Sequence, residues 1–141
     1  MTKILIMGLP GSGKTWLAER LTKHLDNCAW YNADVIRGAA NDWDFSPEGR
    51  LRQANRMKTF ADFEVSNGRS VMCDFVAPVP AARDQFDADK VIWVDTIKEG
   101  RFEDTNKMFE APTEVDVHIE THMSDEEIKT LAHHMMEDWN V

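Results

Sequence analysis

The sequence predicts an α/β fold in which a parallel sheet of about five strands is flanked by helices. Two observations lead to this prediction. Short apolar runs alternate with stretches of helical periodicity, and a glycine-rich turn joins the first run to the first helix. The expected strands cover residues 3–7, 27–32, 70–75, 90–95 and 115–119. A length of 141 residues suits one hydrophobic core, so we expect a single domain over residues 1–141.

Helix signals fall between the apolar runs. Helices are expected over residues 16–21, 34–40, 47–67, 80–86 and 124–139. Pro47 suits the first turn of the long third helix, with Ser46 before it as the N-cap. Ser124 and Glu127 have the spacing of a capping box, which predicts where the last helix begins. Helices that connect successive strands in this way are typical of parallel sheets.

Residues 8–15 read Gly-Leu-Pro-Gly-Ser-Gly-Lys-Thr and fit the phosphate-binding loop pattern at each constrained position. Glycines allow this loop to curl, so that backbone N–H groups point at phosphate oxygens, and the helix N-terminus adds partial positive charge. Lys14 can reach the β- and γ-phosphates, and the Thr15 hydroxyl can hold Mg²⁺. The sequence therefore predicts a P-loop NTPase fold that takes ATP and Mg²⁺. The expected ATP-binding residues are Gly8, Pro10, Gly11, Ser12, Gly13, Lys14, Thr15 and Trp16.

Composition narrows the class of partner. The net charge of −9 argues against a general nucleic-acid binder, which needs a basic surface to displace counterions. No apolar run approaches the ~20 residues of a membrane span, and the first strand begins too early to leave room for a signal peptide. Cys28 and Cys73 lie in apolar runs, which predicts buried thiols rather than a disulfide. These features favour a cytoplasmic protein without a membrane or nucleic-acid partner.

Two acids follow expected strands at the edge where open α/β sheets bind ligands. Asp74 closes an apolar strand as in a Walker B segment, so it can orient a Mg²⁺-bound water beside Thr15. Asp34 lies where a phosphoryl acceptor would enter, and it can hold or deprotonate the acceptor hydroxyl. We predict catalytic roles for Lys14, Asp34 and Asp74, with either acid as the base. The alternative for each acid is a helix cap or a loop carboxylate.

Residues 96–113 carry several charges without a clean period. Phosphoryl transfer needs cations around the moving group and the exclusion of water, which a closing segment supplies. We therefore predict a short lid here, with Arg101 and Lys107 as its cations, against the alternative of an ordinary surface connection. Basic residues also gather between 37 and 58, which indicates either a solvated helix face or an anion-binding pocket.

Two further segments carry a family resemblance. Residues 32–37 are similar to the pattern Asp-Gly-Asp-Asn-x-Arg, and residues 44–50 to Gly-Phe-Ser-x-x-x-Arg, both found in the adenylylsulfate kinases. The resemblance runs from about residue 3 to residue 119. It implies transfer of phosphate from ATP to the 3′-hydroxyl of adenylylsulfate, with an aromatic ring stacked on the acceptor's base and arginines on its anionic group. The implied acceptor-binding residues are Asp34, Arg37, Phe45, Arg50, Gln53 and Phe75.

The resemblance continues with differences. Residues 70–78 are similar to a family strand ending in Ser-Phe-x-Ser-Pro, and residues 109–112 to Tyr-Glu-Ala-Pro at the end of the family's lid. This implies that Phe109 is the aromatic residue of a lid that is shorter here than in the family. Three acceptor-side positions depart from the family pattern, namely Asn32, Gln53 and Asp74. Because the family often dimerises, the resemblance also implies a homodimer.

These features predict an ATP-dependent phosphotransferase that resembles adenylylsulfate kinase and acts on a hydroxyl of adenylylsulfate or a similar nucleotide-like molecule. A second interpretation keeps the fold but takes a nucleoside, a modified nucleobase or a polynucleotide end as acceptor. A third, from another class, is a non-catalytic nucleotide-binding switch.

Overall fold

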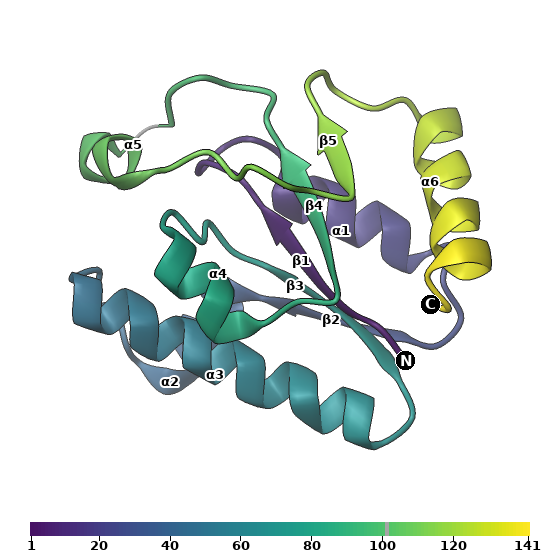
Figure 1. The fold of residues 1–141 in the computed structure, drawn as a ribbon, viewed down its shortest axis with the longest axis horizontal. Helices are drawn as coiled ribbons and strands as arrows, with labels where there is room; N and C mark the ends of the chain where they lie inside the picture. The colour runs from purple at the N-terminus through teal and green to yellow at the C-terminus, as the bar shows by residue number, and fades with distance from the viewer. Residues whose placement is uncertain (101) are drawn as a thin grey trace.

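A five-stranded parallel sheet forms the centre of the molecule (Figure 1). The computed structural model describes residues 1–100 and 102–141. Its strands are β1 (Lys3–Met7), β2 (Cys28–Asn32), β3 (Ser70–Asp74), β4 (Lys90–Val94) and β5 (Val117–Ile119). They lie in the order β2-β3-β1-β4-β5, with each neighbouring pair parallel. The predicted fold class is therefore confirmed.

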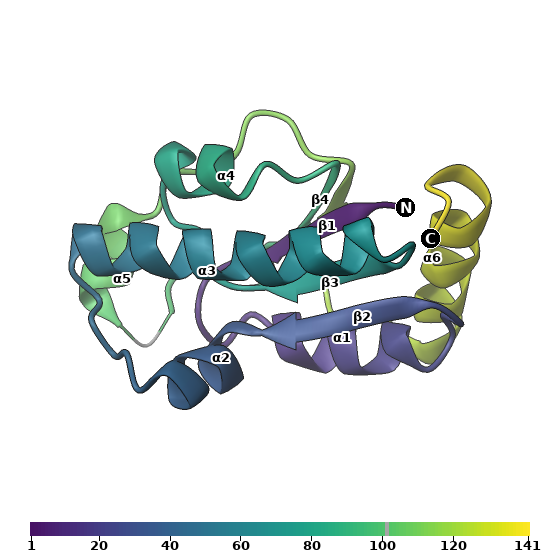
Figure 2. The ribbon, with the colours of Figure 1, turned by 90° about the horizontal axis from the view of Figure 1, so that it is seen from below.

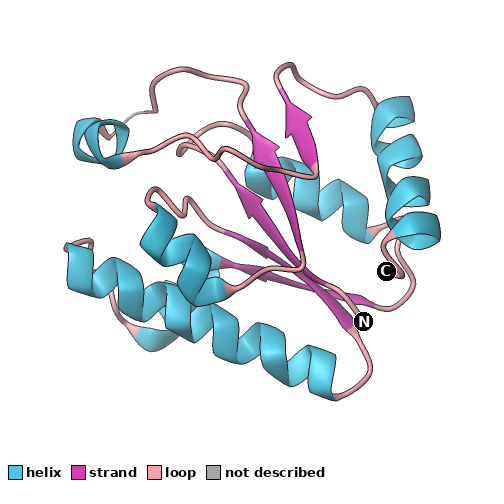
Figure 3. Cartoon of the chain, viewed as in Figure 1, coloured by secondary structure: helices cyan, strands magenta, loops and turns pink. Residues whose placement is uncertain are grey.

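Helices cover both faces of this sheet (Figure 3). They are α1 (Lys14–Thr22), α2 (Ala33–Ala40), α3 (Pro47–Ser66), α4 (Pro80–Phe86), α5 (Glu103–Met108) and α6 (Asp125–Asp138). Helices α1 and α6 pack on one face, and α3 and α4 pack on the other (Figures 1 and 2). Among the residues that the structure describes, no helix combines the length and apolar character that a membrane crossing requires.

The two-sided covering explains why β1 is apolar throughout. Ile4 and Ile6 contribute to the core beneath α1 and α6, whereas Leu5 and Met7 contribute to the core beneath α3 and α4. All four side chains are fully buried. A strand buried on both faces reads as a continuous hydrophobic run instead of an alternating one, which is what the sequence shows here.

The helix ends follow the capping signals in the sequence. Ser46 accepts a hydrogen bond from the Gly49 N–H at the start of α3, with Pro47 in the first turn. Ser124 and Glu127 form both hydrogen bonds of a capping box at the start of α6. These caps satisfy N–H groups that the first helical turn leaves unpaired.

Two segments differ from the sequence prediction in detail. The last strand is shorter than expected, covering Val117–Ile119 and not residues 115–119. The region 96–113 contains a short helix, α5, although it has no helical period. Contacts outside the helix hold it: the buried Thr105 accepts a hydrogen bond from Arg50 of α3, and the Asn106 side chain bonds to the Gly100 backbone. Tertiary contact rather than local periodicity thus stabilises α5.

Both cysteines are free and buried, as predicted. Burial raises the pKa of the Cys28 thiol to about 12 and places that of Cys73 well above its ordinary value. Neither thiol is therefore ionised near neutral pH, which suits packing residues and not nucleophiles.

The first loop glycine is required by packing. A Cβ on Gly8 would overlap the Val94 carbonyl oxygen, which belongs to the backbone of β4. We expect Gly8→Ala to lower the free energy of unfolding by about 3 kcal/mol, because one of two backbone segments must move. Urea unfolding followed by circular dichroism measures this loss.

Gly68→Ala is the matched control. Gly68 has φ +78, but a methyl group on its Cα would meet open space, so only the left-handed backbone opposes a side chain there. We expect a cost of about 1 kcal/mol. Equal costs at the two positions would contradict the packing argument for Gly8.

Candidate functional site

A cleft of about 790 Å³ opens beyond the carboxyl ends of the strands. Figure 2 shows α2 and α5 at this end of the molecule. The phosphate-binding loop, the start of α2, the start of α3 and the start of α5 all contribute to its walls. The lining residues are Pro10, Gly11, Gly13, Lys14, Thr15, Trp16, Asn32, Ala33, Asp34, Trp43, Phe45, Arg50, Asp74, Phe75, Val76, Phe102, Asp104 and Thr105.

The phosphate-binding loop leads directly into α1. Gly13 precedes the helix with φ 103 in the left-handed region, and it offers no side chain to cap the first turn. The N–H groups of that turn therefore point toward the cleft without a capping side chain, which is the arrangement that binds phosphate. The Lys14 side chain is buried and its ammonium donates to the Leu9 carbonyl at 3.0 Å, so it lies back along the loop.

One asparagine joins the two groups predicted to serve the metal. The Asn32 amide nitrogen lies 3.0 Å from the Thr15 hydroxyl and 2.8 Å from Oδ1 of Asp74. Its Oδ1 accepts from the Val35 N–H at 3.0 Å, which caps α2. Asn32 and Asp74 are direct neighbours in the β2–β3 register, so the sheet itself places them together.

Asp74 is a buried carboxylate with a donor on each oxygen. Trp30 donates to Oδ2 at 2.8 Å, opposite the Asn32 bond to Oδ1, and only 2% of the residue is exposed. Burial raises the pKa of Asp74 to about 6, against the lowering effect of Trp30, Lys14 and Asn32. The carboxylate is thus fixed in position, and its charge is stabilised by donors from β2.

Asp34 has a different environment. It lies in the first turn of α2, lines the cleft and is exposed. An exposed carboxylate in the cleft can accept a hydrogen bond from a ligand hydroxyl, whereas both oxygens of Asp74 already accept hydrogen bonds from the protein. The two acids are therefore distinguished by geometry.

Among the residues predicted to bind the acceptor, Phe45 lies between two guanidinium groups. The Arg37 Cζ is 4.4 Å from the ring centroid and the Arg50 Cζ is 5.5 Å from it. Arg50 also donates to the Phe45 carbonyl and to the Thr105 hydroxyl, and so connects α3 to α5. Cation–π contacts and these hydrogen bonds hold the ring at the edge of the cleft.

Arg37 and Gln53 lie behind the cleft wall and are absent from its described lining. Arg37 is 4% exposed and donates to the carbonyls of Asp42 and Asp44. Gln53 donates to the Ala33 carbonyl and accepts from Arg56. In this structure both residues position the backbone around α2, and their predicted contacts with an acceptor stay predictions.

The predicted lid residues have separate positions. Lys107 is exposed and pairs with Glu103 on α5 at 3.4 Å. Phe109 stacks against Trp93 with ring centroids 6.4 Å apart, and Arg83 lies over its ring. Neither Lys107 nor Phe109 is among the described residues that line the cleft, and Arg101 lies outside the described residues.

Sequence reasoning missed several cleft residues. Trp43, Phe102, Asp104 and Thr105 all line the cleft, and Asn32 links Thr15 to Asp74, the two groups predicted to serve the metal. Trp43 and Phe102 could have been found from the sequence, because each is an aromatic residue in an otherwise polar segment. Such residues indicate exposed rings that serve a site. Asn32 could also have been found, because it is a polar residue at the end of a strand and lies two positions before Asp34.

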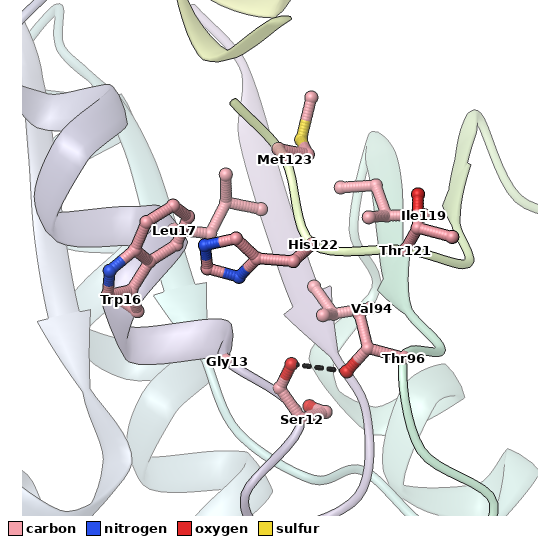
Figure 4. A pocket seen from close by; sticks show the side chains of 10 residues that line it. All are labelled: Ser12, Gly13, Trp16, Leu17, Val94, Thr96, Ile119, Thr121, His122 and Met123. Atoms are coloured by element: carbon pink, nitrogen blue, oxygen red, sulfur yellow. Dashed lines mark hydrogen bonds between the residues drawn. The ribbon is translucent and has the colours of Figure 1, made fainter. Parts of the chain in front are cut away.

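Figure 4 shows a smaller pocket beside the loop, with a volume of about 20 Å³. The rings of Trp16 and His122 form one wall, with centroids 4.2 Å apart. Arg20 lies over the Trp16 ring at 4.1 Å. The Thr96 hydroxyl donates to the Ser12 carbonyl at 2.6 Å and connects the segment after β4 to the loop. Trp16 lines this pocket and the large cleft alike.

The fold and the phosphate-binding site are those of a P-loop kinase. Comparison with known proteins then gives the family: residues 1–98 match the model of the adenylylsulphate kinase family. The chain belongs to this family.

Individual relatives agree with this assignment. A probable adenylyl-sulfate kinase of Aeropyrum pernix is 37% identical over 89 residues, which is 57% of this chain and 46% of that protein. The chain thus matches about half the length of this relative. A second probable adenylyl-sulfate kinase, from Pseudomonas aeruginosa, is 24% identical over 94% of this chain and 76% of its own length.

Solved structures share the fold at lower identity. The APS kinase of Mycobacterium tuberculosis in complex with AMPPNP and APS superposes with a TM-score of 0.73 at 18% identity, covering 99% of this chain and 98% of that one. A sugar kinase from Janibacter sp. gives a TM-score of 0.72 at 19% identity over 94% and 92% of the two chains. Kinases that act on different acceptors therefore share this fold.

The contact between Asn32 and Asp74 can be tested by Asn32→Asp. Aspartate caps a helix as well as asparagine does, so α2 keeps its cap, whereas the amide donor to Asp74 and to the Thr15 hydroxyl is lost. Two carboxylates then face each other, and we expect a loss of about 2 kcal/mol in unfolding free energy at pH 7. The loss should shrink at pH 5, where the pair can share a proton. Adding Asp74→Asn to this variant should restore stability, and a failure to do so would contradict the assigned contact.

The raised pKa of Asp74 predicts a pH-dependent stability. Its pKa in the folded state is about 6, above the ordinary value of 3.8. At pH values between these two, the folded state therefore keeps a proton that the unfolded state has released. The unfolding free energy of the wild type should therefore fall, relative to Asp74→Asn, by about 2–3 kcal/mol as the pH rises from 4 to 7. Urea unfolding of both proteins in EDTA measures the difference. A constant difference across this range would contradict the burial argument.

Proposed function

We propose that the protein is an ATP-dependent phosphotransferase that transfers the γ-phosphate to a hydroxyl of adenylylsulfate or a similar nucleotide-like small molecule. The observation that carries this proposal is that one cleft is lined both by Lys14 and Thr15 of the phosphate-binding loop and by Asp34 and Phe45. A site for two ligands in one cavity is what direct transfer between them requires. Membership of the adenylylsulphate kinase family supports the nature of both ligands.

The ATP phosphates bind to the loop and to the first turn of α1. Backbone N–H groups of that turn and the Lys14 ammonium stabilise the charge on the phosphates. This stabilisation, together with positioning, is the protein's main contribution to phosphoryl transfer. Trp16 follows the loop directly and lines both cavities, so we place the base of ATP against its ring. The hydrogen bond from Lys14 to the Leu9 carbonyl must then be exchanged for contact with phosphate.

The residues for Mg²⁺ fit a hard cation with oxygen ligands. The Thr15 hydroxyl and the Asp74 carboxylate are both in the cleft and are joined through Asn32. When bound, Mg²⁺ neutralises charge on the phosphates and orients them. Thr15 would hold the ion directly and Asp74 through water, while the Asn32 and Trp30 bonds keep the carboxylate in place.

Asp34 is a better candidate than Asp74 for contact with the acceptor hydroxyl. It is exposed in the cleft, so it can accept the proton of the acceptor hydroxyl or orient that hydroxyl toward the γ-phosphate. Asp74, which Asn32 connects to Thr15, serves the metal side. Phe45 offers its ring to the base of the acceptor, and Arg50 and Phe75 complete that wall.

A homodimer and a cytoplasmic location belong to this proposal as well. A hexameric APS kinase from Thiobacillus denitrificans shares the fold, with a TM-score of 0.73 at 19% identity, covering 96% of this chain and 28% of that one. Analytical ultracentrifugation of the purified chain would measure its own assembly state.

The test is transfer of labelled γ-phosphate from ATP-Mg²⁺ to adenylylsulfate and to a panel of nucleosides, with an acceptor-free control. We expect acceptor-dependent turnover that falls at least ~100-fold in Lys14→Ala and Asp34→Asn, because these remove phosphate and hydroxyl contacts. Lys14→Ala should also weaken ATP binding, whereas Asp34→Asn should leave it within about threefold.

Asp84→Asn is the matched control. Asp84 is an exposed acid on α4 outside the described cleft lining, so turnover should be unchanged. Tight ATP binding with no turnover on any acceptor would overturn the proposal and favour a nucleotide-binding switch. Turnover on a nucleoside but not on adenylylsulfate would keep the kinase and replace its acceptor.

A further inference from the structure

Arg83 of α4 holds the chain that follows α5. Its guanidinium lies over the Phe109 ring, with Cζ 5.5 Å from the ring centroid, and Nη2 donates to the Glu110 carbonyl. The Glu110 N–H in turn donates to the Pro78 carbonyl at 2.7 Å, in the loop before α4. The Phe109 ring also stacks on Trp93 of β4. The chain after α5 is therefore attached to α4, to the loop before it and to the sheet (Figure 1).

The same guanidinium holds the loop between β3 and α4. Its Nε donates to the Ala77 carbonyl at 2.9 Å, and Nη2 lies 3.4 Å from the Pro78 carbonyl oxygen. Ala77 is buried and has φ +47, in the left-handed region that residues with a side chain rarely adopt. Local preference does not explain this conformation, so surrounding contacts such as the bond from Arg83 must maintain it.

Both segments that Arg83 holds continue into the wall of the cleft. The loop between β3 and α4 contributes two lining residues directly before Ala77, namely Phe75 and Val76. The segment at the start of α5 contributes three more, which are Phe102, Asp104 and Thr105. Arg83 itself is absent from the described lining. One guanidinium outside the cleft thus joins two parts of its wall through backbone carbonyls.

The other attachments of this segment lie elsewhere. At its start, the Thr96 hydroxyl donates to the Ser12 carbonyl of the phosphate-binding loop. In its middle, Arg50 of α3 donates to the Thr105 hydroxyl. Neither bond involves Arg83, so the loss of Arg83 would release the far end of the segment and leave its connection to the phosphate-binding loop in place.

We infer that Arg83 is a positioning residue for the phosphoryl acceptor. It fixes the chain after α5 to the loop after β3, so that both parts of the wall are in place before the acceptor binds. This inference rests on the proposed function, in which the acceptor occupies this part of the cleft. Walls that are already ordered spare a ligand the free-energy cost of ordering them. The loss of Arg83 therefore weakens the binding of the acceptor and not the binding of ATP.

The arrangement requires an arginine rather than any cation. A guanidinium carries five N–H donors in a planar fork, so it can donate to several carbonyls while it covers an aromatic ring. A lysine ammonium is a compact charge on a flexible stem and lacks this fork. The effect of Arg83→Lys should therefore be closer to that of Arg83→Ala than to the wild type. Full recovery by lysine would contradict the role assigned to the hydrogen bonds.

The transfer assay with ATP-Mg²⁺ and adenylylsulfate separates positioning from folding. We expect Arg83→Ala to raise KM for adenylylsulfate about tenfold, to change kcat less than about threefold and to leave the Kd of ATP within about twofold. A merely structural role would reduce the folded fraction, which lowers the apparent kcat and leaves both KM and Kd unchanged.

Arg69→Ala is the matched control. Arg69 donates to the Asn27 and Glu64 side chains, directly before the start of β3 and thus at the opposite end of that strand from the cleft. Its loss should lower stability to urea without changing KM for adenylylsulfate. An equal rise in KM in the two variants would overturn the inference.

Two further measurements do not depend on turnover. In Arg83→Ala the Glu110 amide should exchange its hydrogen about tenfold faster, whereas the Asp95 amide, bonded to the Ile119 carbonyl, should not change. Calorimetry on protein saturated with AMPPNP and Mg²⁺ should show adenylylsulfate binding that is about tenfold weaker in Arg83→Ala.

These results distinguish the inference from the proposed function. If the wild type binds adenylylsulfate without transferring phosphate, the proposed transfer fails, and the ratio of the two affinities still decides the role of Arg83. If wild type and Arg83→Ala bind it equally well, the inference is wrong whatever the turnover. If the wild type does not bind it, the nucleoside of the panel that binds best replaces it, and a wild type that binds none of these compounds contradicts both.

Discussion

The hydrogen bonds around the Asp74 carboxylate connect the parts on which the site depends. β2 supplies both donors, β3 supplies the acid, and Asn32 continues the connection to Thr15 at the start of α1. A buried charge costs free energy unless donors satisfy it, so this acid is tolerated only with the β2–β3 register in place. The same asparagine caps α2 and thereby fixes where Asp34 enters the cleft. The same hydrogen bonds thus tie together the β2–β3 register, the start of α2 and the relative positions of Thr15 and Asp74.

Much of the fold could be predicted because local and global preferences agree. Three local signals each predict one structure. They are the apolar run of β1, the caps at Ser46 and Ser124, and the glycine-rich loop. The cleft was harder to predict, because its walls combine residues that are distant in sequence. Thr105 and Asp104 line it from α5, which the Arg50 hydrogen bond connects to α3. Arg37 is a different case, since a motif gives a residue's place but does not show that its guanidinium already donates to the Asp42 and Asp44 carbonyls.

The predicted ATP side of the cleft is better defined by this structure than the predicted acceptor side. The phosphate-binding loop leads into a helix whose first turn has no capping side chain, as a phosphate site requires. On the side predicted for the acceptor, Arg52 and Arg56 are both paired with Asp42. Sugar kinase and APS kinase structures superpose on the chain about equally well, so the backbone alone does not select an acceptor.

The half-exposed rings of Trp43, Phe45 and Phe102 have a thermodynamic consequence. A ligand that covers them removes apolar surface from water, and this transfer is accompanied by a negative change in heat capacity. The enthalpy of acceptor binding should therefore become more favourable as the temperature rises, while the affinity changes much less. An acceptor held by ion pairs alone would lack this temperature dependence.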